Sequence, residues 1–177
     1  MSTTKASLKL LRLLALFVFA MLLPIAGSPA VGIGPKELPK PTDYISDFAH
    51  VLSPRAVKEI DRVCTQLDHS NADTQIAVVT ISSLNGADIA EYARDLANTW
   101  GVGRKETHRG VLVLLAINDH KWRIEVGRGL EGILPNSKAA AIGEDMLPQL
   151  RANDFDDAVM LAIHEIAQAV LDKAPVN

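Results

Sequence analysis

Hydrophobic and polar residues follow two periodic patterns along the chain, and these patterns predict its helices and strands. In four segments apolar residues recur every three or four positions, the spacing of a helix with one buried face. We expect these helices over residues 54–69, 89–100, 137–147 and 154–172. Short apolar or alternating runs predict strands. These lie at 75–82, 110–117 and 121–127.

The ends of two helices and the exposure of two strands can also be predicted. Ser53 followed by Pro54 is a good helix start, and Asp154 is the expected cap of the last helix. The run 110–117 is apolar at every position, so both of its faces should be covered. The run 121–127 alternates and should be covered on one side only.

The order α-β-α-β-β-α-α indicates an α/β fold, a three-layer α/β/α sandwich around a small mixed sheet. Strands 75–82 and 110–117 are separated by a helix and should be parallel. A short polar turn joins 110–117 to 121–127, so that pair should form an antiparallel hairpin.

The N-terminus reads as an export signal. Lys5, Lys9 and Arg12 precede or begin an apolar run over 10–23, and small residues follow near Ala30. We therefore predict a signal peptide over 1–30, a Pro/Gly-rich linker over 31–43 and a folded domain over 44–173. The protein should be periplasmic or secreted. If the signal is not cleaved, residues 10–23 would tether it to the inner membrane.

Composition excludes some partners. Residues 1–30 hold three of the 18 basic residues and none of the 21 acidic ones, leaving a net charge of −6 for the rest. Such an acidic domain argues against a nucleic-acid partner. The single cysteine, Cys64, cannot form an internal disulfide and fits the apolar face of the first helix, so we expect it to be a core residue.

One motif invites a nucleotide interpretation and does not support it. Residues 127–132, "GRGLEG", spell G-x-G-x-x-G after a predicted strand. A dinucleotide fingerprint needs a helix next and a further strand beyond it. Here only helices follow, and Glu131 would place a carboxylate in the phosphate cradle, so we expect no nucleotide cofactor. The glycines either shape an irregular connection or present Arg128 and Glu131 at a site; both interpretations stay open.

Several segments resemble one family. They are "SDFAHVLS" (46–53), "QIAVVTI" (75–81), "WGVG" (100–103) and "RGVLVLLAINDHKWRIEVGRGLEG" (109–132). In this order they are similar to the TPM domain, an exported domain of bacteria, the thylakoid lumen and some animal membrane proteins. The resemblance covers about residues 43–172 and implies an α/β/α sandwich.

The resemblance implies less about activity. Some plant lumenal members are acid-phosphatase-like, some members bind calcium, and others are accessory subunits of membrane complexes. This chain departs from the family pattern at three places. It has His108-Arg109 where an acidic residue and an amide are common, Asn136 where aspartate is common, and Arg128 where an aromatic residue is frequent.

The candidate site residues are mainly carboxylates. Asp47 and Glu131 are the catalytic candidates; alternatively, Asp47 bonds backbone amides in a turn. A calcium site would use oxygen ligands from separate loops. Its candidate ligands are Asp47, Asp119, Glu131 and Asn136. Asp119 also fits ordinary turn chemistry. No transition metal is expected, because the histidines are scattered.

A basic cluster lies between residues 104 and 128, and it would suit an anion or an acidic partner. Its candidate binding residues are Arg109, Arg123 and Arg128. The other interpretation is a solvated hairpin face.

Three functions are consistent with these observations. The first is an accessory or adaptor protein that docks on a protein complex at the membrane. The alternatives are a low-turnover phosphatase and a non-catalytic calcium-binding module. Whether the chain is an enzyme is left open.

Overall fold

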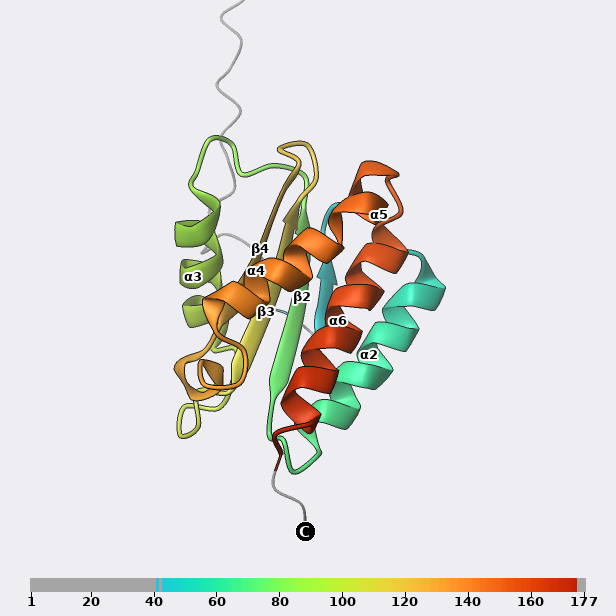
Figure 1. Cartoon of the computed structure of the whole chain (residues 1–177). Helices are drawn as coiled ribbons and strands as arrows, with labels where there is room; N and C mark the ends of the chain where they lie inside the picture. The colour runs from blue at the N-terminus through green and yellow to red at the C-terminus, as the bar shows by residue number, and fades with distance from the viewer. Residues whose placement is uncertain (1–40, 42, 175–177) are drawn as a thin grey trace, which may run out of the picture. The chain divides into compact units, whose positions relative to one another are not determined.

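The structure, a computed structural model, describes residue 41 and residues 43–174 (Figure 1). The predicted signal peptide and most of the predicted linker lie outside the described residues. The elements follow in the order β1 (Ile45–Asp47), α2 (Pro54–Asp68), β2 (Gln75–Ile81), α3 (Ile89–Trp100), β3 (Gly110–Ala116), β4 (Lys121–Val126), the 3-10 helix η1 (Arg128–Leu130), α4 (Asn136–Asp145), α5 (Leu147–Arg151) and α6 (Phe155–Leu171).

The four strands form one mixed sheet in the order β1-β2-β3-β4. β1 pairs in parallel with β2, and β2 in parallel with β3, with Gln75 opposite Gly110. β4 returns antiparallel to β3, with Ala116 opposite Lys121. The predicted parallel pair and the predicted hairpin are both confirmed.

Strand β1 was missed by the sequence prediction, which had a helix as the first element. Its three residues are too few to display alternation. Their pairing with the middle of β2 defines the strand: Ile45 lies opposite Val78, and Asp47 opposite Thr80. This long-range contact adds a parallel edge strand that the local pattern does not reveal.

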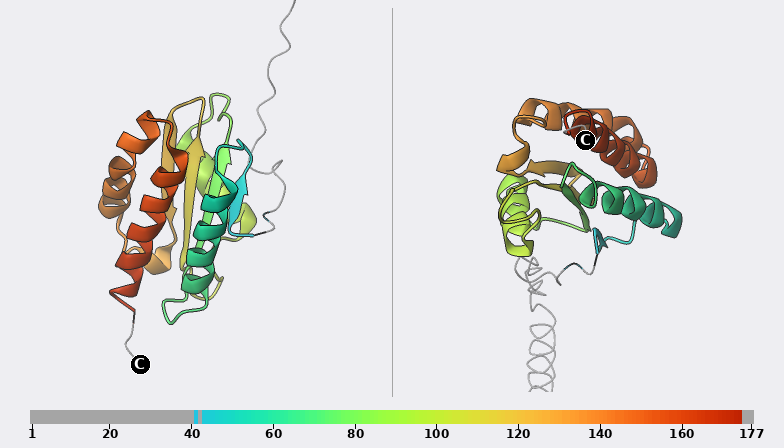
Figure 2. Two further views of the ribbon diagram at one scale, coloured as in Figure 1. Left: turned by 90° about the vertical axis from the view of Figure 1, so that its right-hand side faces the viewer. Right: turned by 90° about the horizontal axis from the view of Figure 1, so that it is seen from below.

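Helices cover both faces of the sheet, which confirms the α/β/α architecture. Figure 2 shows α3 on one side and α2, α4 and α6 on the other. Alternate residues of each strand enter the two cores. On β3, Val111, Val113 and Leu115 belong to the core shared with α2, α4 and α6. Leu112 and Leu114 belong to the core beneath α3.

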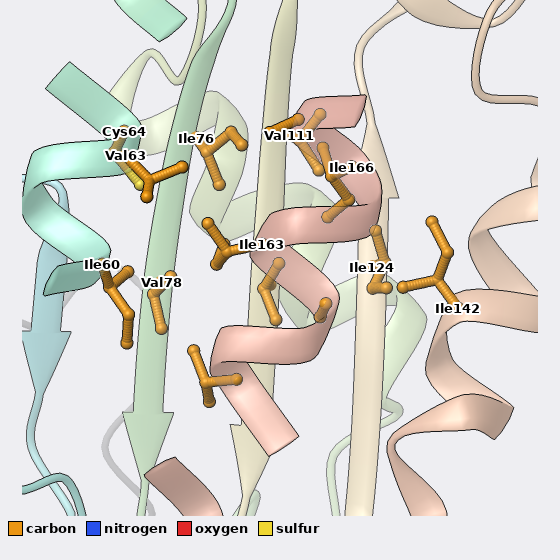
Figure 3. Close-up of a cluster of buried hydrophobic side chains, with 14 of the residues drawn as sticks. Ile60, Val63, Cys64, Ile76, Val78, Val111, Ile124, Ile142, Ile163 and Ile166 are labelled. Carbon is orange, nitrogen blue, oxygen red and sulfur yellow. The ribbon is translucent and has the colours of Figure 1, made fainter. Parts of the chain in front are cut away.

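The larger core is built from branched aliphatic side chains (Figure 3). Ile60 of α2, Ile163 of α6 and Ile142 of α4 all point toward the sheet. Cys64 is fully buried among them, and burial raises the pKa of its thiol to about 12. The prediction that Cys64 is a core residue is confirmed.

Two helix starts agree with the sequence prediction. The Ser53 side chain accepts from the Ala56 amide at the start of α2, and the Asp154 side chain accepts from the Asp157 amide at the start of α6. The helix predicted over 137–147 is α4, and the short α5 extends the chain's helical course beyond it, with Pro148 in its first turn. Pro148 cannot donate a helical hydrogen bond, so it is tolerated only near a helix start.

The prediction that β4 is covered on one side only is wrong. Ile124 faces the larger core, as expected. The opposite face of β4 lies beside α3, where the Arg94 Nε lies 3.9 Å from Glu125 Oε1. The Glu125 side chain is only 18% exposed. Charged residues can line a covered face when they are paired with one another. None of the helices described here is long and apolar enough to cross a membrane.

Candidate functional site

The predicted site residues fall at two opposite ends of the sheet. Asp47 ends β1 and Asp119 lies in the turn after β3, at the carboxyl ends of the parallel strands. Arg128, Glu131 and Asn136 follow β4, which runs the other way. A seven-residue strand such as β3 spans about 20 Å. Asp47 and Glu131 therefore cannot act on the same reacting atom, and they do not form one catalytic pair.

Asp47 is occupied by local hydrogen bonds. One carboxylate oxygen accepts from the Val51 amide at 3.2 Å, and the other from the Leu52 amide at 3.0 Å. The Thr80 hydroxyl donates to the first of these oxygens in a short contact. These bonds tie β1 to β2 and hold the turn that leads to α2. The geometry matches the alternative role of Asp47 as an acceptor for turn amides.

Asp119 is occupied in a similar way. Its carboxylate accepts from the Leu84 amide at 2.8 Å, which fastens the hairpin turn to the loop after β2. That hydrogen bond is the main cause of a pKa below the usual value for this carboxyl. This hydrogen bond joins two loops that lie 35 positions apart in the sequence, so Asp119 serves as a tertiary contact.

The four candidate calcium ligands are consequently divided. Asp47 and Asp119 lie at one end of the sheet, whereas Glu131 and Asn136 lie at the other, both exposed. Within residues 43–174 no group of three His, Cys, Asp or Glu side chains is placed to hold a metal ion. A single calcium site that uses all four predicted residues does not fit this geometry.

The glycine loop, residues 127–132, packs its backbone against the loop that precedes β3. The Gly129 amide donates to the His108 carbonyl at 3.1 Å, and the Gly127 amide donates to the Gly110 carbonyl at 2.8 Å. A Cβ on Gly127 would lie 2.3 Å from the His108 carbonyl oxygen, and one on Gly129 2.0 Å from that of Thr107. Close backbone approach therefore requires these two glycines.

A pocket of about 470 Å³ opens between this loop and α3, on the α3 side of the sheet. We call it the glycine-loop pocket. Its volume is within the usual range for ligand pockets, about 300–1,000 Å³. Its polar lining residues come from four segments and are Arg94, Asn98, His108, Glu125, Arg128 and Glu131. Of the sequence-predicted residues, Arg128 and Glu131 are brought together here.

The predicted basic cluster is largely committed to internal contacts. Arg109 donates from Nε to the Ala72 carbonyl at 2.8 Å and from Nη1 to the Gly129 carbonyl at 3.3 Å. Arg123 donates to Glu125 Oε2 from Nε at 3.1 Å and from Nη2 at 2.8 Å. Both of these predicted binding arginines thus brace the structure. Arg128 is the predicted one whose side chain has no hydrogen-bond or ion-pair partner within the described region.

Arg104 is committed as well, through a network that anchors α2. Its guanidinium lies 3.0 Å from Asp68 Oδ1 and also pairs with Asp73. The Tyr44 hydroxyl donates to Asp68 Oδ2 at 2.7 Å. Burial, followed by the Asp68 contact, raises the pKa of Tyr44 to about 12. This network fixes the loop before β3 from its outer side.

Sequence reasoning missed Arg94 and His108 as pocket residues. Arg94 lies on the polar side of α3, and only the packing of α3 beside β4 turns it toward the pocket. His108 adopts a left-handed backbone conformation, with φ 51°. Its position next to Arg109, immediately before β3, was the one available signal.

A second pocket of about 290 Å³ lies at the hairpin end of the sheet. Its lining is mainly apolar and includes Trp122, Leu147, Leu150 and Phe155. None of the predicted catalytic, anion-binding or metal-binding residues lines it. The glycine-loop pocket is therefore the candidate functional site.

Comparison with known proteins identifies the family. The family model described as the TPM domain matches residues 45–169. The Bacillus subtilis protein YdjH is 28% identical over 141 residues, which cover 80% of this chain and 53% of YdjH. The chain thus spans about half the length of this curated relative.

Solved structures support the same fold. An N-terminal domain from P. gingivalis has a TM-score of 0.73 at 25% identity, covering 80% of this chain and 93% of that one. An N-terminal domain from Corynebacterium glutamicum has a TM-score of 0.61 at 14% identity, covering 85% and 94%. The BA42 protein of Bizionia argentinensis has a TM-score of 0.61 at 16% identity, covering 71% and 86%. This chain belongs to the TPM domain family.

Proposed function

We propose that this protein is an exported accessory protein that docks on a membrane-associated protein complex through the glycine-loop pocket. One observation carries the proposal: two charged side chains of the pocket, Arg128 and Glu131, have no ion-pair partner in the described part of the chain. Arg128 and Glu131 are both exposed and both face the pocket from the glycine loop. Functional side chains on a rigidly held loop are typical of recognition sites.

The scaffold supports recognition because the pocket walls are held in place. The glycine loop is bonded to the loop before β3, and Leu130 within it is fully buried. Arg109 bridges the glycine loop to the segment after α2. A preorganised surface binds a partner with a smaller loss of conformational entropy.

The docking proposal is tested by exchanging the two free charges. The variant Arg128→Glu/Glu131→Lys keeps the net charge of the protein and reverses both charges at the pocket. The matched control is Glu59→Arg/Arg62→Glu, which exchanges an exposed ion pair on α2. Both variants are expressed with their full N-terminus in the native host, and each carries a photo-crosslinking amino acid at Asn98.

We expect a defined crosslinked product for the unaltered protein and the control, and its loss for the pocket variant. The crosslinked protein should be recovered in the exported, membrane-associated fraction. Equal crosslinking by the pocket variant and the control would contradict docking through this pocket. Recovery of the protein from the cytoplasm would contradict the proposed export.

A low-turnover phosphatase is the second candidate, because Arg94 and Arg128 line one pocket with Glu131. Arginine can stabilise a transferring phosphoryl group. The lining residues we describe include no Ser, Thr, Cys or Asp, and Glu125 is held by Arg123. Activation of water would then depend on Glu131 or His108. Phosphomonoester turnover that falls in Glu131→Gln but not in Asp47→Asn would favour this candidate, with calcium added in parallel to test the calcium-binding alternative.

A further inference from the structure

The glycine-loop pocket contains two arginines that lack a full counter-charge among the described residues: Arg128 has no ion-pair partner, and Arg94 shares Glu125 with Arg123. Arg94 approaches from α3 and its closest carboxylate oxygen, on Glu125, is 3.9 Å away, at the limit of an ion pair. Arg128 approaches from the glycine loop and is exposed. By contrast, Arg104, Arg109 and Arg123 of the same region all have close internal acceptors.

The carboxylates of the pocket do not cancel these two charges equally. Glu125 receives two hydrogen bonds from Arg123 on one oxygen, so it is already compensated. Glu131 is exposed, has no hydrogen-bond or ion-pair partner within residues 43–174, and lines the pocket together with Arg128. An incoming negative group is therefore best placed where both Arg94 and Arg128 can reach it, because charge-assisted hydrogen bonds to arginine are strong.

Part of the pocket lining is apolar. Ala97 and Val102 are half-buried and line the pocket, whereas Leu112 of β3, which also lines it, is almost fully buried. Small phosphate or sulfate ions would leave this surface uncovered. A ligand that places a carboxylate at the arginines and an aliphatic side chain on the apolar lining would use both parts.

We infer that the glycine-loop pocket binds a peptide carboxylate that is adjacent to an aliphatic side chain, either at a chain terminus or on an internal acidic residue. This inference rests on the proposed docking function and names the chemistry of the partner segment. Arg94 and Arg128 hold the carboxylate, and the apolar lining at Ala97 and Val102 receives the aliphatic group. Glu131 accepts from a backbone amide of the peptide.

Peptide titrations of the purified full chain test the inference. The first probe is a dye-labelled peptide that ends in Gly-Ala-Leu with a free carboxylate, and the second is the same peptide with an amidated end. The third is an amidated peptide with an internal Glu-Leu pair. Fluorescence anisotropy measures the Kd of each. The variants are Arg94→Ala, Arg94→Lys and Arg128→Ala, and Arg62→Ala on α2 is the control.

We expect a carboxylate peptide to bind, and the amidated Gly-Ala-Leu peptide to bind at least about tenfold more weakly, since a hydrogen bond to a charged group contributes roughly 1.5–3 kcal/mol. Preference for the first or third probe shows whether the carboxylate is terminal or internal. Arg94→Ala and Arg128→Ala should each weaken binding about tenfold. Arg94→Lys should recover part of the loss, because it keeps the charge and loses the fork geometry. Arg62→Ala should bind normally.

Equal affinity for the free-carboxylate and amidated peptides, or full affinity in both arginine variants, would overturn the inference. Competition by inorganic phosphate at the same concentration as the peptide would also overturn it, since the aliphatic contact would then be irrelevant. These outcomes are separate from a failure of docking. Peptide binding combined with unchanged crosslinking in Arg128→Glu/Glu131→Lys would defeat the docking function alone, and crosslinking without any peptide binding would defeat this inference alone.

Discussion

The two ends of the sheet use similar residue types for different purposes. At the hairpin end, the carboxylates of Asp47 and Asp119 accept hydrogen bonds from backbone amides, and Asp47 also accepts one from the Thr80 hydroxyl. At the glycine-loop end, Arg128 and Glu131 face an open pocket. A carboxylate after a strand is thus not evidence for a site until its partners are known. The difference lies in whether the local backbone offers free amides, as at the first end, or is already paired, as at the second.

The largest expected effect comes from removing the acceptor at the hairpin end. Asp47→Ala leaves the Val51 and Leu52 amides and the Thr80 hydroxyl without it. A fully buried donor that loses its acceptor costs roughly 1–3 kcal/mol, and a half-buried one less, because water can reach it. Thr80 is buried, whereas Val51 and Leu52 are half-buried, so we expect a total loss of about 2–4 kcal/mol in the free energy of unfolding. Urea unfolding measures it. The comparison fails if Asp47→Ala is as stable as the unaltered protein but loses partner binding.

The next largest effect should be found in the glycine loop. Gly129→Ala would place a Cβ 2.0 Å from the Thr107 carbonyl oxygen, so the two loops must separate. We expect about 1–3 kcal/mol of destabilisation, as for other overpacked sites, together with weakened peptide binding. Gly132→Ala is the matched control, because nothing lies within 4 Å of the added Cβ. Equal stability of the two variants would show that the loops are not held as described.

A smaller effect should follow from the Tyr44 hydroxyl at the glycine-loop end. Because folding raises the pKa of Tyr44 to about 12, its contribution is complete below the ordinary value of about 10. It is lost as the pH rises from about 10 to 12. Tyr44→Phe should therefore be less stable at pH 8, and its stability should fall less between pH 10 and 12. Parallel curves for both proteins in that window would contradict the assignment.

The smallest effect should come from Asp119, whose carboxyl has a depressed pKa in the folded protein. Its ionised form therefore contributes stability above the ordinary pKa of about 3.9, and the contribution is lost as the pH falls through the folded-state value. Asp119→Asn should flatten the acid side of the stability profile between pH 6 and 3. Thermal melts in that range measure the change. An unchanged acid slope in the variant would show that ionised Asp119 does not contribute to stability.

Most of the fold could be predicted from sequence because its main elements are long enough to show their period. Helices α2, α3 and α6 and strands β2 and β3 follow directly from apolar spacing. Strand β1 could not be predicted, because three residues acquire strand character only by pairing with residues 33 positions away. The position of α3 over β4 likewise depends on tertiary packing.

The candidate site was only partly predictable. Arg128 and Glu131 stand out because glycines surround them, and both line the pocket. In the sequence, Arg109 and Arg123 look like equally good binding residues, but in the structure both donate hydrogen bonds to internal acceptors. Arg94 carries no local signal at all. Charge counts along a sequence cannot separate bracing arginines from free ones, since the partners come from other elements.

The interlocked glycines also constrain how this end of the molecule can change. Any side chain at position 129 would collide with the Thr107 carbonyl oxygen, and any side chain at position 127 with that of His108. A change in the loop before β3 consequently requires a matching change in the loop after β4. A laboratory exchange of either loop alone with that of a relative should therefore fit poorly, whereas both loops together with Arg94 and Asn98 of α3 should carry the pocket onto another scaffold of this fold.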